Sequence, residues 1–185
     1  LSGSQLSIVS QITDGGNTAG LTKVFPGLLA LTNANPYSGG TSITGGTLRV
    51  SNGGAIGSGT AIISSGAALE LSGDVTLPMS INFSGTGVSG NGAIRNLSGS
   101  NVLSGTITNI ANNSEIQVDA GRLDISGNLT DGGAGRATRK TGSGLLLISG
   151  TSSSTGAMIV EEGEFRVNGS YAGTAFIAGG DISGS

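Results

Sequence analysis

The sequence contains no cysteine, histidine or tryptophan among its 185 residues. Without cysteine there is no disulfide, thiolate metal ligand or cysteine nucleophile, and without histidine there is no imidazole base for a serine triad. Aromatic residues make up 3% of the chain and charged residues 10%, both well below the usual values for globular proteins. Carboxylates are therefore the main side chains left to consider for catalysis.

The chain also lacks any run of Lys or Arg, and its formal net charge is −3. A protein that binds nucleic acid needs a basic surface to neutralise phosphates, so we expect no nucleic-acid partner. No apolar segment reaches the 18 or so residues that a membrane-spanning helix requires, so we expect no direct insertion into a membrane.

Glycine is abundant, with 36 residues, and a long internal duplication organises the sequence. Residues 1–50 align without gaps on residues 118–167, at a separation of 117, with 14 identities in 50 positions. Chance alone would give about five identities in a sequence of this composition. Substituted positions stay apolar, as in Leu31/Ile148, Ile43/Val160 and Leu48/Phe165. We interpret residues 1–185 as a single continuous repeat segment.

Short β-strands of three to six residues alternate with Gly, Asn, Asp and Ser corners along the whole chain. The strands are expected near residues 1–10, 27–32, 41–44, 47–50, 61–63, 68–71, 75–77, 81–83, 93–97, 105–108, 115–118, 123–126, 144–149, 157–160 and 164–167. No longer segment has helical periodicity, so we expect almost no helix. Strands this short suit a coil of three strands that stacks on the next coil.

The predicted fold is therefore all-β: a parallel β-helix, or β-solenoid, of about nine coils. With about 20 residues a coil and about 4.8 Å between coils, the rod is about 45 Å long. The predicted interior consists of aliphatic residues and one Phe: Leu29, Leu31, Ile43, Leu48, Val50, Leu69, Leu71, Ile94, Ile116, Val118, Leu123, Ile125, Leu146, Ile148, Val160, Phe165 and Val167.

Two segments carry a family resemblance. Residues 20–50 read GLTKVFPGLLALTNANPYSGGTSITGGTLRV, and residues 140–167 are a diverged second copy. They resemble the autotransporter passenger-associated β-strand repeat. The resemblance implies a right-handed β-helix that is secreted or exposed on a bacterial surface, and it identifies an architecture more than an activity.

The carboxylates need examination because a parallel β-helix can host polysaccharide-cleaving enzymes. Glycoside hydrolysis requires two facing carboxyl groups, and stacked coils could bring Asp119 near Glu70 or Glu164. We favour the simpler interpretation that they are solvated, outward positions. Asp14 and Asp131 each precede Gly-Gly at the same phase of the duplication, which favours a turn role over calcium binding.

Two further sets of residues invite functional hypotheses. Arg49 and Arg166 recur at one phase, so we expect both to project from the same face, where edge charges discourage sideways pairing. Thr41, Thr44 and Thr47 suggest an ice-binding array, but no Thr-x-Thr column repeats in every coil. We expect no catalytic residue, metal or cofactor.

The sequence as a whole predicts a structural and adhesive, non-catalytic module of an extracellular or cell-surface bacterial fibre. Its expected partners are other segments of the same long polypeptide or identical subunits, contacted through exposed coil ends, and host or matrix glycans or proteins. Two alternatives remain open at this stage. One is a filament subunit that stacks end to end, and the other is a carbohydrate-active β-helix enzyme.

Overall fold

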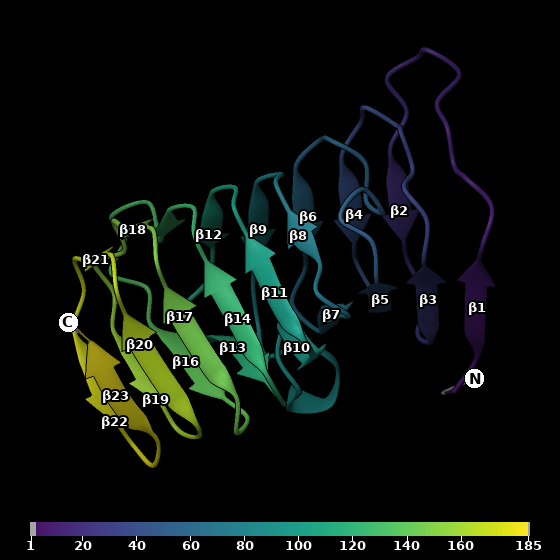
Figure 1. Cartoon of the computed structure of the whole chain (residues 1–185). Helices are drawn as coiled ribbons and strands as arrows, with labels where there is room; N and C mark the ends of the chain where they lie inside the picture. Colours follow the sequence, from purple (N-terminus) through teal and green to yellow (C-terminus); the bar gives the residue numbers. More distant parts are fainter. Residues whose placement is uncertain (1–2, 185) are drawn as a thin grey trace.

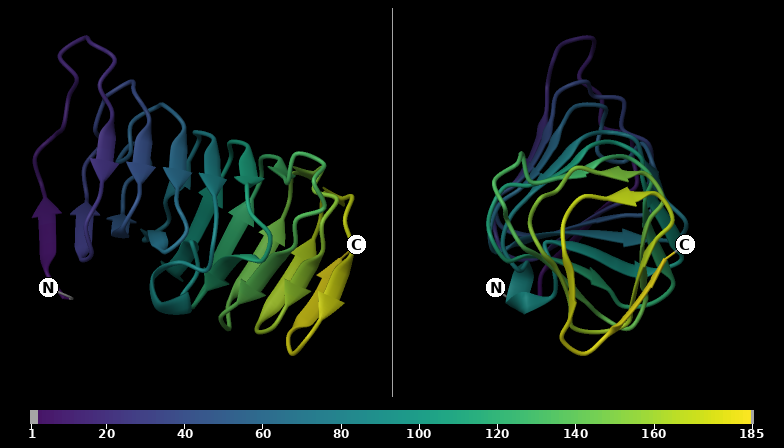
Figure 2. Two further views of the ribbon diagram at one scale, coloured as in Figure 1. Left: turned by 180° about the vertical axis from the view of Figure 1, so that it is seen from behind. Right: turned by 90° about the vertical axis from the view of Figure 1, so that its left-hand side faces the viewer.

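The computed structural model describes residues 3–184 and shows a rod built from three parallel sheets (Figure 1). The chain winds around the rod axis, and each strand pairs in parallel with the strand at the same position in the next coil. Seen along the axis, the coils lie over one another around a common interior (Figure 2). The predicted β-solenoid of about nine coils is confirmed.

The three sheets form the three sides of the rod. Sheet A contains β1 (Gln5–Ile8), β3 (Leu28–Leu31), β5 (Gly46–Val50), β7 (Ala67–Ser72), β10 (Ile94–Ser98), β13 (Ser114–Val118), β16 (Thr138–Thr141), β19 (Met158–Val160) and β22 (Ala175–Ile177). Sheet B contains β2 (Leu21–Lys23), β4 (Thr41–Ile43), β6 (Ala61–Ile63), β9 (Ile81–Phe83), β12 (Ile107–Asn109), β15 (Leu129–Thr130), β18 (Thr151–Ser152) and β21 (Ser170–Tyr171). Sheet C contains β8 (Thr76–Leu77), β11 (Ser100–Leu103), β14 (Arg122–Ile125), β17 (Leu145–Ile148), β20 (Glu164–Val167) and β23 (Asp181–Gly184).

A coil is defined here as one circuit that begins with its sheet A strand. Coils 4 to 8 have three strands each, as predicted, but coils 1 to 3 have none in sheet C. Residues 9–20, 32–40 and 51–60 form loops in that position, and the first of these extends furthest from the rod (Figure 1). The prediction of three strands in every coil is therefore wrong for the first part of the rod.

The loops of coils 1 to 3 keep a packed interior because Tyr37 fills the space that strand side chains occupy elsewhere. Its ring is 2% exposed, and its hydroxyl lies 2.6 Å from Thr41 Oγ1. Asn35 ties three loops together, since its Oδ1 accepts from Ile12 N (2.8 Å) and its Nδ2 donates to Ala55 O (2.6 Å). Loops with their own hydrogen bonds replace the missing sheet.

The interior consists of columns of aliphatic side chains that run along the axis. All predicted core residues are buried except Val167, which is partly buried. Each fully buried Leu, Ile or Val contributes about 1.5–3 kcal/mol relative to exposure. One column in sheet A reads Leu29, Leu48, Leu69, Ile94, Ile116, Lys140, Val160 and Ile177. A lysine therefore interrupts an otherwise aliphatic column.

Most predicted strands lie within two residues of an observed strand. The first prediction covers β1, although residues 1 and 2 lie outside the described part of the chain. The 3₁₀ turn at Val88–Gly90 is the single helical element in residues 3–184, in keeping with the expected lack of helix. The sequence analysis missed β2, β11, β15, β16, β18, β21, β22 and β23.

Candidate functional site

The carboxylates considered for glycoside hydrolysis do not face each other across a cleft. Glu70 is buried, so the expectation that these carboxylates are solvated is wrong for this residue. Arg95 lies between Glu70 and Asp119, with Nη1 3.2 Å from Glu70 Oε1 and Nη2 2.7 Å from Asp119 Oδ2. Arg49 contacts the other oxygen of Glu70 at 2.8 Å. Glu164 lies on sheet C and is paired with Arg166. Each of these carboxylates is paired with a guanidinium group. The pairs made by Arg49 and Arg95 link neighbouring coils, whereas Glu164 and Arg166 lie in the same strand.

The alternating charges on the outer surface of sheet A follow the strand register. Arg49, Glu70 and Arg95 occupy equivalent positions in β5, β7 and β10. Each pair therefore joins one coil to the next, and the Glu70 side chain is 8% exposed. Sequence reasoning missed Arg95, although the alternation of charge at intervals of 21 and 25 residues was a visible signal.

Asp131 is buried and receives hydrogen bonds from two consecutive coils. Gly133 N (3.0 Å), Arg136 N (2.9 Å), Thr155 N (3.1 Å) and Gly156 N (3.1 Å) all donate to its carboxylate. Burial opposes ionisation, but these hydrogen bonds outweigh it and lower the pKa to about 2. The carboxylate oxygens face N–H donors, so the geometry supports a turn and an inter-coil contact and does not resemble calcium coordination.

The equivalent residue in the first copy, Asp14, makes the same contact with Ser38. Ser38 N and Oγ each donate to Asp14 Oδ2 at 2.8 Å. These bonds lower the pKa of Asp14, which lies on the surface. Asp131 lies 117 residues after Asp14, and Thr155 lies 117 residues after Ser38, so the two contacts are equivalent in the duplication. Within residues 3–184 no group of three or more Asp, Glu, His or Cys side chains could hold a metal ion.

A second contact that recurs in both copies involves a lysine at a corner of the coil. Lys140 Nζ donates to the carbonyl oxygens of Thr141 (2.8 Å), Gly142 (2.6 Å) and Glu162 (2.9 Å). The side chain is completely buried, and this burial lowers its pKa to about 8, although the charge of Glu162 acts in the opposite direction. All three protons of the ammonium group thus have an acceptor.

Lys23 makes the equivalent contacts in the first copy, where Nζ donates to Phe25 O and Gly45 O. Burial lowers the pKa of Lys23 as well. In each copy the lysine binds the carbonyl groups of its own corner and of the corner in the next coil. The identity of Lys23 and Lys140 was visible in the alignment, but its role was not, because a lysine in a strand usually points to solvent.

The two copies lie on different sides of the rod. Strands β2, β3, β4 and β5 of the first copy belong to sheets B, A, B and A. Their counterparts β16, β17, β19 and β20 belong to sheets A, C, A and C. The expectation that Arg49 and Arg166 share a face is therefore wrong, since Arg49 lies on sheet A and Arg166 on sheet C. A separation of 117 residues is not a whole number of coils.

The threonines considered for an ice-binding array are also dispersed. Thr41 points inward, is 1% exposed and donates to Ile56 O at 2.9 Å. Thr44 lies at the corner after β4, and Thr47 lies in β5 of sheet A. These three residues share no surface.

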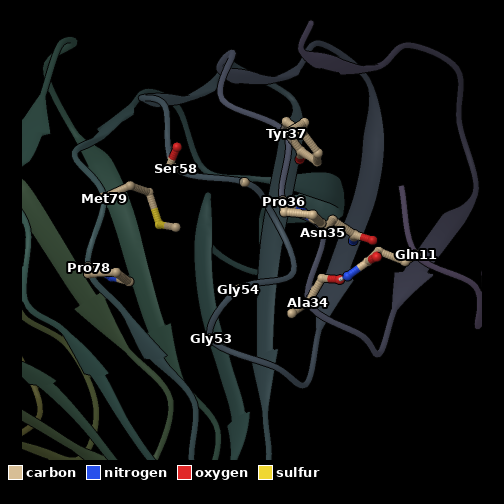
Figure 3. A pocket seen from close by; sticks show the side chains of 11 residues that line it. Gln11, Ala34, Asn35, Pro36, Tyr37, Gly53, Gly54, Ser58, Pro78 and Met79 are labelled. Atoms are coloured by element: carbon tan, nitrogen blue, oxygen red, sulfur yellow. Dashed lines mark hydrogen bonds between the residues drawn. The ribbon is translucent and has the colours of Figure 1, made fainter. Parts of the chain in front are cut away.

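A groove lies where the loops of coils 1 to 3 meet the residues that follow the first strand of sheet C (Figure 3). Its volume is about 600 Å³. It is mostly apolar and is lined by Gln11, Ala34, Asn35, Pro36, Tyr37, Gly53, Gly54, Gly57, Ser58, Pro78 and Met79. Gly57 is required here because a Cβ would lie 2.4 Å from the Tyr37 ring. No carboxylate, histidine or cysteine is among these lining residues.

The three parallel sheets and stacked coils define a β-solenoid repeat protein in which many charged groups make contacts between coils. Comparison with known families agrees with this architecture. Residues 21–50 and 139–167 match the family described as passenger-associated-transport-repeat, so the predicted resemblance is confirmed for these two segments.

A curated autotransporter adhesin is similar in sequence to part of this chain. The chain is 38% identical over 91 residues to "Adhesin BmaC autotransporter" of Brucella suis biovar 1 (strain 1330). The aligned region is 49% of this chain but 3% of that protein, so the chain spans a small part of the relative's length. No solved structure gives a significant match. Within residues 3–184, no helix combines the length and apolar character needed to cross a membrane.

Proposed function

We propose that this chain is a structural and adhesive segment of a bacterial autotransporter-like passenger, secreted or exposed at the cell surface, and that it is not catalytic. The main support is the nine-coil rod that carries two copies of the passenger-associated repeat. A stack of coils displays long, regular sides at a distance from the cell. As one continuous segment, the rod contacts other parts of the same polypeptide through its coil ends and host or matrix molecules through its sides.

An adhesion assay tests this proposal. Fluorescent beads coated with residues 1–185 are expected to attach to epithelial cells or matrix-coated glass several-fold more than beads coated with an unrelated β-solenoid of similar charge. Equal attachment of the two kinds of bead would contradict the adhesive function. Negative-stain microscopy on the same preparation checks that the chain forms short, discrete rods.

The enzymatic alternative has a direct test at the carboxylates that Arg95 holds. If Glu70→Gln or Asp119→Asn abolishes turnover of any glycan by the wild-type chain, the non-catalytic proposal fails. We expect no turnover by the wild type, because both carboxylates are bound to guanidinium groups.

End-to-end stacking of identical chains is a second candidate function. Large apolar side chains are exposed on the first and last coils, including Leu6 (59%), Phe25 (76%), Phe176 (56%) and Ile177 (60%). Strands β1 and β22 are also the outer strands of sheet A, so their backbone groups can pair with another strand. Fibres that grow with protein concentration support this candidate, and rods of constant length contradict it.

A further inference from the structure

The outer surface of sheet B carries no charged side chain. Of the 19 charged residues in the chain, Lys23 alone lies in one of the eight sheet B strands. Lys23 does not present its charge to a partner on this surface, because Nζ binds the carbonyl groups of the corner. By contrast, charged residues lie in five of the nine strands of sheet A and in three of the six strands of sheet C. The rod therefore has one neutral side.

Polar side chains on this neutral side form two rows that run along the rod axis. The first row consists of residues that are register partners in successive strands: Thr22, Ser42, Ile62, Asn82, Thr108 and Thr130. The second row lies two residues earlier in each coil and contains Gly20, Gly40, Thr60, Ser80, Thr106 and Asn128. Six strands at a spacing of about 4.8 Å make each row about 24 Å long.

Many polar groups of these rows have no hydrogen-bond partner within the described part of the protein. Seven side chains neither donate nor accept a hydrogen bond in the described part of the chain: Thr22, Ser42, Thr60, Ser80, Asn82, Thr106 and Thr108. On sheets A and C several charged groups bind a neighbouring side chain, as in Arg49–Glu70, Arg139–Glu161, Thr141–Glu115, Ser149–Asp124 and Arg166–Glu164, although other polar side chains such as Thr47 and Ser100 have no such partner within residues 3–184. Sheet B thus presents hydrogen-bonding groups that are uncharged, whereas sheets A and C also present charged groups.

The shape of the surface suits a long, narrow ligand. Gly20 and Gly40 leave a shallow depression of about 300 Å³ beside Thr22, Ser42 and Ile62. Ile62 is 42% exposed and adds an apolar contact in the middle of the hydroxyl row. The two rows contain no aromatic residue or arginine, the residues that usually anchor a protein–protein interface.

We propose that the outer surface of sheet B binds a neutral polysaccharide that lies along the rod axis. A sugar chain offers hydroxyl groups at regular intervals and no charge, which matches two rows of uncharged donors and acceptors. An anionic polymer would find no cation on this surface. The proposal rests on the adhesive function above and specifies its ligand class.

Affinity electrophoresis in native gels tests the proposal with hydroxyethyl cellulose and dextran as neutral polymers and alginate as an anionic one. The wild type is expected to be retarded by a neutral polymer and not by alginate. Thr108→Glu, at the fifth of the six positions of the first row, is expected to raise the dissociation constant at least about tenfold, because the polymer would have to desolvate the carboxylate. Asn82→Asp provides a second variant that adds the same charge with almost no change in shape.

The matched control is Ser100→Glu, which adds one carboxylate to the outer surface of sheet C beside Arg122. It is expected to change the dissociation constant less than twofold. Absence of retardation by both neutral polymers, stronger retardation by alginate, or equal effects of Thr108→Glu and Ser100→Glu would overturn the proposal. So would sedimentation data in which the wild type self-associates and Thr108→Glu does not. Bead attachment without polysaccharide binding would leave the adhesive function in place and reject only this ligand class.

Discussion

The buried ammonium group of Lys140 predicts an unusual dependence of stability on pH. The pKa of Lys140 is lowered from 10.5 to about 8 by burial. Because the folded-state pKa lies below the ordinary value, protonation of this group opposes folding below pH 8, and the opposition is relieved as the pH rises from 8 towards 10.5. The free energy of unfolding is therefore expected to increase by about 1 kcal/mol between pH 7 and pH 9.

Few other groups change charge in this window, since the chain has no histidine or cysteine. The pKa of Tyr171 is raised to about 12 by burial and by the charge of Asp131, and burial also raises the pKa of Tyr37. Both tyrosines therefore remain neutral up to pH 9. Urea unfolding followed by far-UV circular dichroism at pH 7, 8 and 9 measures the effect.

The variant Lys140→Met removes the titrating group, so its stability is expected to be nearly constant from pH 7 to pH 9. Lys23→Met is the matched control in the other copy and should retain most of the increase, because Lys23 is only partly buried. Stability of the wild type that is flat or falls over this range, or an unchanged increase in Lys140→Met, would refute the reasoning.

Two further predictions concern Asp131 and Gly57. Asp131→Asn should lower the free energy of unfolding at pH 7 by about 2 kcal/mol, because the native carboxylate has its pKa lowered to about 2. That contribution should also disappear in the wild type as the pH falls from 4 towards 2, whereas Asp14→Asn, on the surface, should have a smaller effect in the same acid titration. Gly57→Ala should lower the melting temperature more than Gly132→Ala, because both have φ near +67° but only Gly57 has its Cβ position against the Tyr37 ring. Equal losses in the two glycine variants would show that backbone strain alone determines the cost.

The sequence contains enough information to predict the architecture. Alternating apolar positions such as Leu29 and Leu31 predict strands, and their recurrence at about 20 residues predicts stacked coils. The loops of coils 1 to 3 were harder to anticipate, because Tyr37 and Asn35 occupy the interior only through contacts with neighbouring coils. Two-residue strands such as β15 and β18 depend on pairing with their neighbours and have little local signal.

The functional residues were less predictable than the fold. The carboxylates Glu70 and Asp119 were identified as candidates, but Arg95, which joins them, comes from another coil, and its position depends on register. The role of Lys140 was hidden for a similar reason, since its three acceptors are backbone carbonyl groups that carry no sequence signature. Register also decides which side chains share a side of the rod.

The first copy of the duplication lies in sheets B and A, and the second copy lies in sheets A and C. This difference has a consequence for how β-solenoid repeats diversify. Two stretches of related sequence lie on sides of the rod about one third of a turn apart, so equivalent residues of the two copies face different surroundings. A β-solenoid that gains or loses a few residues between copies can therefore move existing motifs to another side of the rod without changing the motifs themselves.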